Sequence, residues 1–252
     1  MDSKRPLIGV GLACFVVFVM ASAPAQLLTD LVASDDGLRF IGVTGSIWNG
    51  ETRSIQTPFF QLHKTSWSLH ATDLLGGRLG ARIETEWPGG FASGDIRIGI
   101  GGVISLHDFE ATGPIMPFIQ ILHLPITGGE FVVKVSELEI ADAWPRSAIG
   151  SVRVGNLPLT LAGVGAGPTG SYEVSFDADP VGDDGRLAGR LTSFSGPLTV
   201  AGTLLLSPPA NYEINARIKA GPGAPVELAR ALQLLGPIDA DGNREFIMSG
   251  SL

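Results

Sequence analysis

Apolar and polar residues alternate one by one in many short segments, and this pattern restricts the fold more than any other feature. Residues 77–87 place four apolar residues at one parity and four charged residues at the other: Leu79, Ala81, Ile83 and Trp87 against Arg78, Arg82, Glu84 and Glu86. The alternation recurs in four further segments, of which the second changes phase near Ser136: 94–102, 129–140, 171–178 and 211–220. Successive side chains of a strand point to opposite faces of its sheet. These segments therefore predict antiparallel strands with one buried and one wetter face.

Glycine-rich turns separate the alternating segments. The 252 residues include 34 Gly and 17 Pro, and 17% of them are charged, which suits strands joined by tight turns better than a helical bundle. Glycine pairs stand at three of the expected turns, beginning at Gly76, Gly89 and Gly128. We therefore expect residues 38–252 to form a mainly β domain. Its core would be an elongated, twisted antiparallel sheet, accompanied by one or two short helices.

Two segments depart from the alternation. Residues 224–236 predict a helix, because Pro225 suits a first turn, Gly236 suits an end, and four apolar residues share helical spacing: Val226, Leu228, Leu232 and Leu235. Residues 113–129 are apolar but contain three prolines. We interpret them as a hydrophobic crossover between two β-rich halves.

The N-terminus carries a long apolar run. Lys4 and Arg5 precede an uncharged stretch over residues 6–25, and about 20 such residues span the hydrocarbon of a bilayer. Positive residues favour the cytoplasmic side. The sequence thus predicts a cytoplasmic tip at 1–5, a single transmembrane helix at 6–25, a short helix or linker at 26–37 and a domain beyond the membrane at 38–252. A cleaved signal peptide is the alternative, because residues 23–25 resemble a cleavage site.

The net charge restricts the class of partner, and the cysteine content restricts how the domain is stabilised. The net charge of −8 argues against a nucleic-acid partner, because phosphate contacts need a basic surface. Cys14 is the single cysteine and lies within the apolar run. The domain beyond the membrane must therefore be stabilised by burial and hydrogen bonds, without an internal disulfide.

Two short motifs in the chain resemble ligand-binding motifs but do not predict a nucleotide-binding or calcium-binding site. Residues 165–170 match G-x-G-x-x-G, but a strand rather than a helix is expected after them, so we interpret them as a turn. Residues 239–243 resemble the start of a calcium loop. Arg244 and Gly250 stand where that loop needs Gly and Glu, so a hairpin turn is expected.

The candidate reactive side chains are scattered. The four histidines form no metal-binding motif: His63, His70, His107 and His123. Glu84 and Glu86 share one strand face, which we interpret as a solvated face. We predict no catalytic, cofactor-binding or metal-binding residues, and no enzyme, although carboxylates that meet only in space stay open at this point.

The stretch 39–50, RFIGVTGSIWNG, has a distinctive pattern and no reactive group. Its glycines at 42, 45 and 50 allow tight turning and close backbone approach. We expect Trp48 to cover the first sheet face, and interpret Trp67 and Trp87 as core residues, with an exposed partner surface as the alternative.

Several blocks of the chain, taken in order, resemble one known family. They are the segment 42–55 with its spacing G-x-x-G-x-x-W-x-G, the Trp and Gly-Arg-Leu strands of 65–84, and the later blocks 157–163, 189–220 and 227–252. This set is similar to the general secretion pathway protein N family of the bacterial type II secretion system. Two turns depart from the family pattern, at residues 207–211 and at Asn243, which puts only local turn geometry in doubt.

The resemblance implies an accessory component of the type II secretion system, held in the bacterial inner membrane by one span, with most of the chain in the periplasm. Such a protein would act in export across the outer membrane by contacting other secretion components, either the inner-membrane platform or the outer-membrane secretin. It would touch membrane lipid through its anchor. The alternative function is a lipid-binding or lipid-transfer β-groove of the AsmA-like type, in which Ile96, Ile98, Ile100 and Val103 line the groove.

Overall fold

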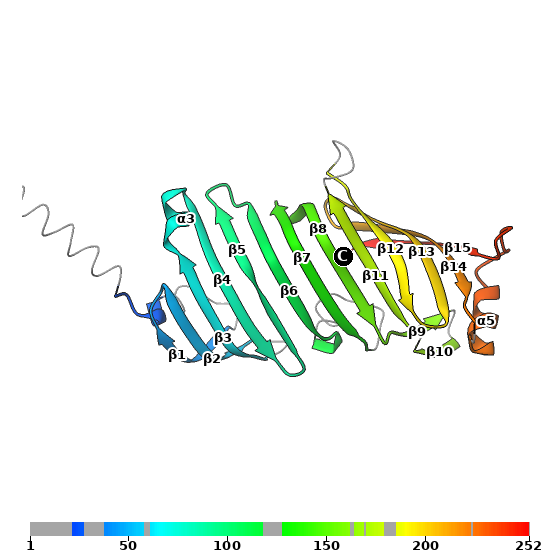
Figure 1. Ribbon diagram of the computed structural model, residues 1–252, viewed down its shortest axis with the longest axis horizontal. Helices are drawn as coiled ribbons and strands as arrows, with labels where there is room; N and C mark the ends of the chain where they lie inside the picture. Colours follow the sequence, from blue (N-terminus) through cyan, green and yellow to red (C-terminus); the bar gives the residue numbers. More distant parts are fainter. Residues whose placement is uncertain are drawn as a thin grey trace, which may run out of the picture. The chain divides into compact units, whose positions relative to one another are not determined.

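In a computed structural model of the chain, the structure describes residues 22–27, 38–57, 61–117, 128–161, 164–168, 170–178, 185–222 and 224–251. They belong to two compact units, Met1–Trp87 and Pro88–Leu252, here called the N-terminal and C-terminal units. Both are mainly β (Figure 1), and thirteen described strands are arranged in antiparallel sheet. The mainly β antiparallel prediction is therefore confirmed.

The expected membrane anchor falls largely outside the described residues, because only residues 22–25 of the range 6–25 are described. No helix within the described ranges combines the length and the apolar character that crossing a membrane requires. The expected anchor stays a prediction.

The N-terminal unit contains four strands and a short helix in chain order. These are β1 (Arg39–Gly45), β2 (Asn49–Gln56), β3 (Gln61–His70), α3 (Ala71–Leu75) and β4 (Arg78–Trp87). Each strand pairs with the next one along the chain. In β4 the even-numbered charged residues are exposed while Ala81, Ile83 and Trp87 are at least partly buried, as the alternation predicts.

Among its described residues, the C-terminal unit has a nine-stranded sheet, a separate hairpin and the helix α5. The sheet strands are β5 (Gly90–Gly99), β6 (Ile104–Pro114), β7 (Glu130–Ala141), β8 (Trp144–Gly155), β11 (Ser171–Ala178), β12 (Leu187–Ser195), β13 (Leu198–Ser207), β14 (Asn211–Ala220) and β15 (Arg244–Ser251). They neighbour one another in that order. The hairpin is β9 (Pro158–Leu161) with β10 (Val164–Pro168), and the helix is α5 (Val226–Gln233).

The strand registers of the C-terminal unit keep apolar residues on one face across all nine strands. One cross-strand row runs from β5 to β15 through Ala92, Ala111, Val133, Val152, Val174, Leu191, Gly202, Ala216 and Phe246. The next row, on the opposite face, runs through Ser93, Glu110, Lys134, Ser151, Ser175, Arg190, Thr203, Asn215 and Ile247. We call these the apolar face and the polar face.

A bulge preserves the two faces where the sequence changes phase. The register of β7 against β8 shifts between Val135 and Glu137, so Ser136 is the extra residue. Without this shift Leu138 would point to the polar face, because a one-residue slip moves a side chain to the other side of a sheet. The phase change expected near Ser136 is thus a bulge.

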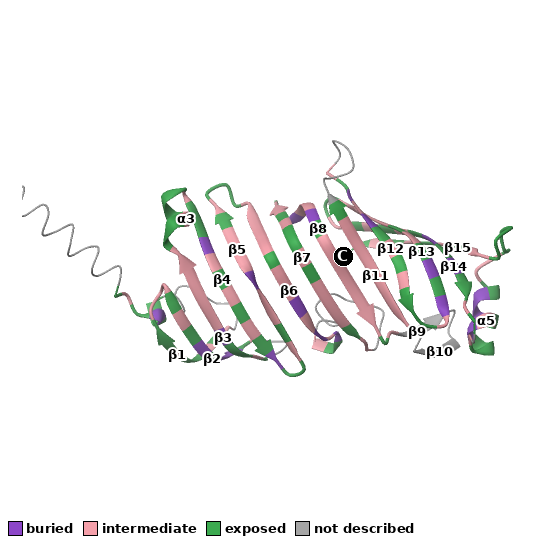
Figure 2. Cartoon of the chain, viewed as in Figure 1, coloured by how far each residue is buried: buried purple, intermediate pink, exposed green. Residues whose placement is uncertain are grey.

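The core of the C-terminal unit lies where α5 covers the apolar face. Leu228 and Leu232 of α5 join a buried cluster with Leu198 and Val200 of β13 and Ile218 of β14. Figure 2 shows this burial as purple segments at the ends of β13 and β14 and on α5. Leu228 is fully buried, so the helix is stabilised by tertiary packing rather than by its own eight residues.

Four details of the sequence-based prediction are wrong. Ile100 lies in the turn after β5 and is 91% exposed, so it does not extend the stripe of Ile96 and Ile98. Val226 starts α5 on its solvent side. Residues 239–243 join α5 to β15, so they form a helix-to-strand connection and not a hairpin. Residues 46–48, which alternation around Ile47 predicts as a short strand before a turn, instead form the turn between β1 and β2.

Candidate interaction surfaces

The G-x-G-x-x-G segment has no dinucleotide-binding geometry. Residues 164–168 form strand β10, and strand β11 begins at Ser171, so no helix N-terminus meets the loop. Gly170 has a φ of +118°, and a Cβ there would collide with the carbonyl oxygen of Ser195. The turn predicted for residues 165–170 is therefore wrong for residues 165–168, which lie in β10, while Gly170 allows a close approach to Ser195 of β12.

The candidate reactive side chains are not brought together. His63 and His70 lie at opposite ends of β3, and His107 lies on β6, while His123 falls outside the described residues. Among the residues that the structure describes, no three His, Cys, Asp or Glu side chains form a group that could hold a metal ion. The prediction that the chain has no catalytic or metal site is left untested by this geometry.

One glycine of the first hairpin, Gly50, lies against an aromatic ring, and that ring belongs to Trp67 rather than Trp48. Trp67 lies on β3 directly opposite Gly50, and its Nε1 donates a hydrogen bond to the carbonyl oxygen of Ile47 at 3.1 Å. A Cβ on Gly50 would overlap the Trp67 ring. Trp48 is partly buried in the turn, and its carbonyl oxygen accepts a hydrogen bond from the backbone N–H of Leu69.

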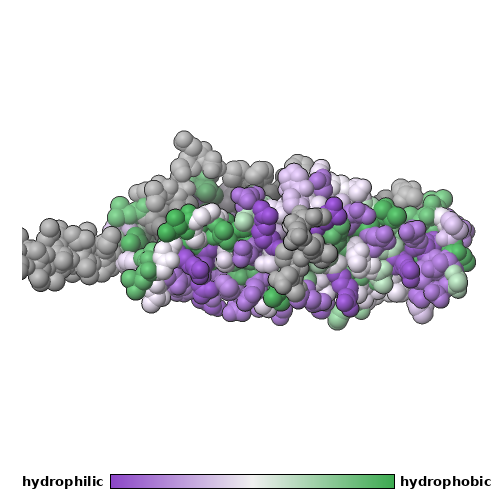
Figure 3. All heavy atoms as spheres, turned by 90° about the horizontal axis from the view of Figure 1, so that it is seen from above, coloured by the Kyte–Doolittle hydropathy of each residue, from purple (hydrophilic) through white to green (hydrophobic). Residues whose placement is uncertain are grey.

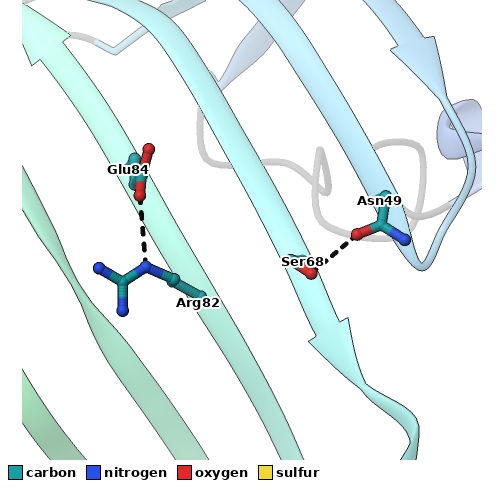
Figure 4. A network of polar contacts seen from close by, with 4 residues as sticks. All are labelled: Asn49, Ser68, Arg82 and Glu84. Carbon is teal, nitrogen blue, oxygen red and sulfur yellow. Dashed lines mark hydrogen bonds and ion pairs between the residues drawn. The ribbon is translucent and has the colours of Figure 1, made fainter.

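The N-terminal unit has a polar row that neighbours Trp67 along β3 and points to the opposite face of the sheet. Ser68 donates a hydrogen bond to Asn49 Oδ1 at 2.7 Å, and Arg82 Nε donates to Glu84 Oε1 at 3.3 Å (Figure 4). The Lys64 ammonium lies 3.8 Å from Glu86. Glu84 and Glu86 are therefore exposed members of surface ion pairs. This agrees with their interpretation as a solvated face.

On the polar face of the C-terminal unit, Arg153, Glu173 and Phe194 form a cluster across three neighbouring strands. Arg153 of β8 donates from Nε and Nη2 to Glu173 Oε2 of β11, at 2.9 and 2.6 Å. Its guanidinium also lies 3.9 Å from the centre of the Phe194 ring on β12. The Phe194 ring is 65% exposed although Arg153 holds one side of it. Aromatic and arginine side chains are the residues most enriched where proteins contact one another.

A second polar surface lies where the chain leaves α5 for β15. A cavity of about 750 Å³ is lined there by the 235–243 connection and by residues of the polar face: Asn215, Arg217, Leu235, Pro237, Ile238, Asp239, Asn243, Glu245 and Ile247. Asp239 accepts hydrogen bonds from the backbone N–H groups of Asp241 and Asn243, at 2.9 and 2.8 Å. These hydrogen bonds to the Asp239 carboxylate hold residues 239–243 in a local turn.

Protonation of Asp239 is expected to loosen this turn. The hydrogen bond from the Asn243 backbone lowers the pKa of Asp239 below its usual 3.8, assisted by the Asn243 side chain, the Asp241 N–H and the charge of Arg217. A lowered pKa means that the carboxylate favours the folded connection above pH 3.8, and that this contribution is lost as the pH falls through the lower folded value. In an NMR titration, the amide protons of Asp241 and Asn243 should shift together with a midpoint below 3.8. A midpoint above that value would contradict the geometry.

Hydrophilic and hydrophobic residues are separated on the surface as well. In Figure 3, hydrophilic residues predominate along the lower side of the view, whereas hydrophobic ones gather mainly above them. This separation follows from the alternation in the strands, which sends each parity to its own face.

Comparison with known proteins assigns the chain to a family. The family described as "Type II secretion system (T2SS), protein N" matches residues 36–246, well over half of the chain and parts of both units. The chain belongs to this family. It is similar to type II secretion system protein N of Aeromonas hydrophila, with 23% identity over 96% of both chains. It is also similar to the protein of that name from Vibrio cholerae serotype O1, with 24% identity over 97% of this chain and 98% of the relative. No solved structure matches.

The matched range of the protein N family includes most of the surfaces described above. The Trp67 ring, the Arg153 cluster and the 235–243 connection all fall within residues 36–246, while β15 extends beyond it. Sequence reasoning missed the Arg153 cluster, because its three members come from strands 20 or more residues apart. A turn at residues 239–243 was predicted as a hairpin, but sequence reasoning did not identify the Asp239 carboxylate as the group that accepts its hydrogen bonds.

Proposed function

We propose that this chain is an accessory inner-membrane component of the type II secretion system, which assists export across the outer membrane through protein–protein contacts. Membership of the protein N family carries this proposal, since the match includes residues of both units. In the proposed topology the N-terminus is cytoplasmic, residues 6–25 form a single span that holds the chain in the membrane, and residues 38–252 are periplasmic. The positive residues Lys4 and Arg5 before an uncharged run support that orientation.

A function in binding rather than catalysis agrees with the side chains on the surface. Ionisable groups of the polar face form ion pairs across strands, as in the 3.0 Å pair between Lys134 and Glu110 and the 2.6 Å pair between Arg153 and Glu173. The backbone N–H of Asn243 is the main cause of the lowered pKa of Asp239, whose hydrogen bonds are local to one turn. Active sites usually gather several perturbed groups in one cleft.

Among the surfaces described, the cluster of Arg153, Glu173 and Phe194 is proposed as a contact point for another secretion component. The ion pair to Glu173 fixes the guanidinium, and the guanidinium in turn restrains the Phe194 ring at 3.9 Å. A ring restrained before binding loses less conformational entropy when a partner covers it. An exposed, pre-ordered phenylalanine among polar neighbours is therefore suited to anchor a partner.

Deletion of the gene tests the proposed function. The bacterium without it should retain a type II substrate in the periplasm and release less into the medium, and a plasmid copy should restore release. Substrate levels are measured in periplasm and medium by immunoblotting. Unchanged release, with a secretin mutant of the same strain failing to release, would rule out a role in export.

Replacement of Phe194 by Ala tests the contact point. Because the ring is 65% exposed, the free energy of unfolding should change by no more than about 0.5 kcal/mol. Export should nevertheless fall, because loss of an anchoring ring typically weakens an interface by about 2 kcal/mol. Phe91→Ala is the matched control, since Phe91 is 40% exposed on the polar face of β5 but lies outside the cluster. Equal export by both variants would exclude the cluster as a contact point.

The lipid-binding alternative is not favoured by the comparisons, because the family and both relatives carry a secretion-system name. The apolar face of the C-terminal unit has one structural use in the described residues, since over β13 and β14 it packs against α5.

A further inference from the structure

Strand β15 has an unprotected edge. It is the last strand in the sheet order of the C-terminal unit, and within the described ranges only β14 pairs with it. All eight of its residues pair with β14 without a bulge, and after Arg244 and Glu245 at its start, residues 246–251 include neither Pro nor a charged side chain. Natural proteins usually shield a regular edge strand with such residues, since its free N–H and C=O groups accept another strand.

The other terminal strand shows what shielding looks like in this chain. Just beyond β1, Pro24 pairs with Ser46, and the Ile47 backbone N–H donates to the carbonyl oxygen of Ala23 at 3.0 Å. Gln26 Nε2 also reaches the carbonyl oxygen of Val43 at 3.4 Å. The residues before β1 therefore occupy part of its outer edge. In the described residues, nothing comparable lies along residues 246–251 of β15.

Ile247 marks the β15 edge as a contact surface. It ends the row of polar residues that crosses eight other strands, and it is 60% exposed. Ile238, which lines the same cavity, is 61% exposed. Two large exposed aliphatic side chains beside free backbone groups are costly for an edge that stays in water, because each leaves apolar surface uncovered.

Sequence complementarity identifies the occupant. Antiparallel strands keep their two faces only if paired residues point to the same side, which restricts the register of a second β15. With Ile247 opposite Ile247 of the second copy, Phe246 meets Met248 on the apolar face. In that register Glu245 meets Ser249 and Arg244 meets Gly250, so like charges do not face each other. The strand is thus complementary to itself.

We infer that two copies of this chain pair antiparallel through β15 about a two-fold axis at Ile247. The pairing continues the hydrogen bonding of the sheet from one copy to the other and covers both Ile247 side chains. The apolar face then continues from Phe246 and Met248 of one copy to those of the other. A closed two-fold contact of this kind uses the same patch on both copies and stops at two. The inference is independent of the proposed role in secretion.

Cysteine cross-linking in the full-length, membrane-bound chain tests this pairing. Cys14 is first replaced by Ser, since it is the single native cysteine. In the paired strands, Ile247→Cys would lie about 4.5–5.5 Å from its copy, within reach of a disulfide. Ser249→Cys, two residues along the same face, would lie about 13 Å from its copy. Asn215→Cys, next to Ile247 on β14, would be separated by about three strand spacings of roughly 4.8 Å.

After mild oxidation, Ile247→Cys should give a band of twice the chain mass on a non-reducing gel, at least about tenfold stronger than the two controls given their distances. Similar bands at all three positions would mean random collision and would overturn the inference. Absence of the Ile247→Cys dimer, or an adduct of another mass, would overturn it as well. As a second measurement, Ile247→Asp should abolish the dimer on a native gel, because it sets two like charges directly opposite each other.

Discussion

Replacement of Leu228 by Ala is expected to lower the free energy of unfolding by about 2–5 kcal/mol, the usual cost of removing a buried leucine side chain. Leu228 is fully buried on α5, and its cluster includes Leu198 and Val200 of β13 and Ile218 of β14. An eight-residue helix is marginal by itself, so loss of this contact should release α5 from the sheet.

Leu234→Ala is the matched control for this loss. Leu234 follows α5 directly and is 67% exposed, so the same chemical change removes little buried surface. Thermal melting of the two purified full-length variants gives the comparison, since 1 kcal/mol corresponds to about 2–4 °C for domains of this size. Amide hydrogen exchange should rise on α5, β13 and β14 in the Leu228 variant alone. A shared melting temperature would mean that α5 does not stabilise the unit.

Five strands, β4, β5, β7, β11 and β14, could be located because each carries its own alternation. The parity of residues 77–87 assigns Ala81, Ile83 and Glu84 to the faces that they occupy in β4. Periodicity also located α5, since Leu228 and Leu232 stand four residues apart on its buried side. The period-two rule for strands was wrong at Ile100. The sequence keeps alternating in the turn that follows β5, although the strand itself ends at Gly99.

The surfaces were harder to predict, because each depends on register between distant strands. Nothing local marks Arg153 as a neighbour of Glu173 and Phe194, which meet only when β8, β11 and β12 align. The role of Ile247 likewise follows from its being the apolar end of a polar row, which only the pairing of nine strands reveals. The family could be identified from sequence resemblance, whereas the candidate contact residues could be identified only from the pairing register of the strands.

Replacement of Gly50 by Ala is expected to destabilise the N-terminal unit by about 1–3 kcal/mol, the usual cost of overpacking. A Cβ at this position would overlap the Trp67 ring on the neighbouring strand. The ring has little freedom to retreat, because its Nε1 is hydrogen-bonded to the Ile47 carbonyl oxygen at 3.1 Å. Either that bond breaks or β2 and β3 move apart.

A double-mutant cycle separates this clash from a general effect of removing glycine. Trp67→Leu removes the ring, so Gly50→Ala should cost much less in that background, and the two changes should be non-additive by about 0.5–3 kcal/mol, as for residues in contact. Gly76→Ala is the control within the same unit, since a Cβ there meets only an ordinary contact at 3.5 Å. Denaturant unfolding of the four variants and the parent chain measures each free energy. Additive changes at Gly50 and Trp67 would show that the ring does not require glycine at position 50, and the distinctive first hairpin would then need a different explanation.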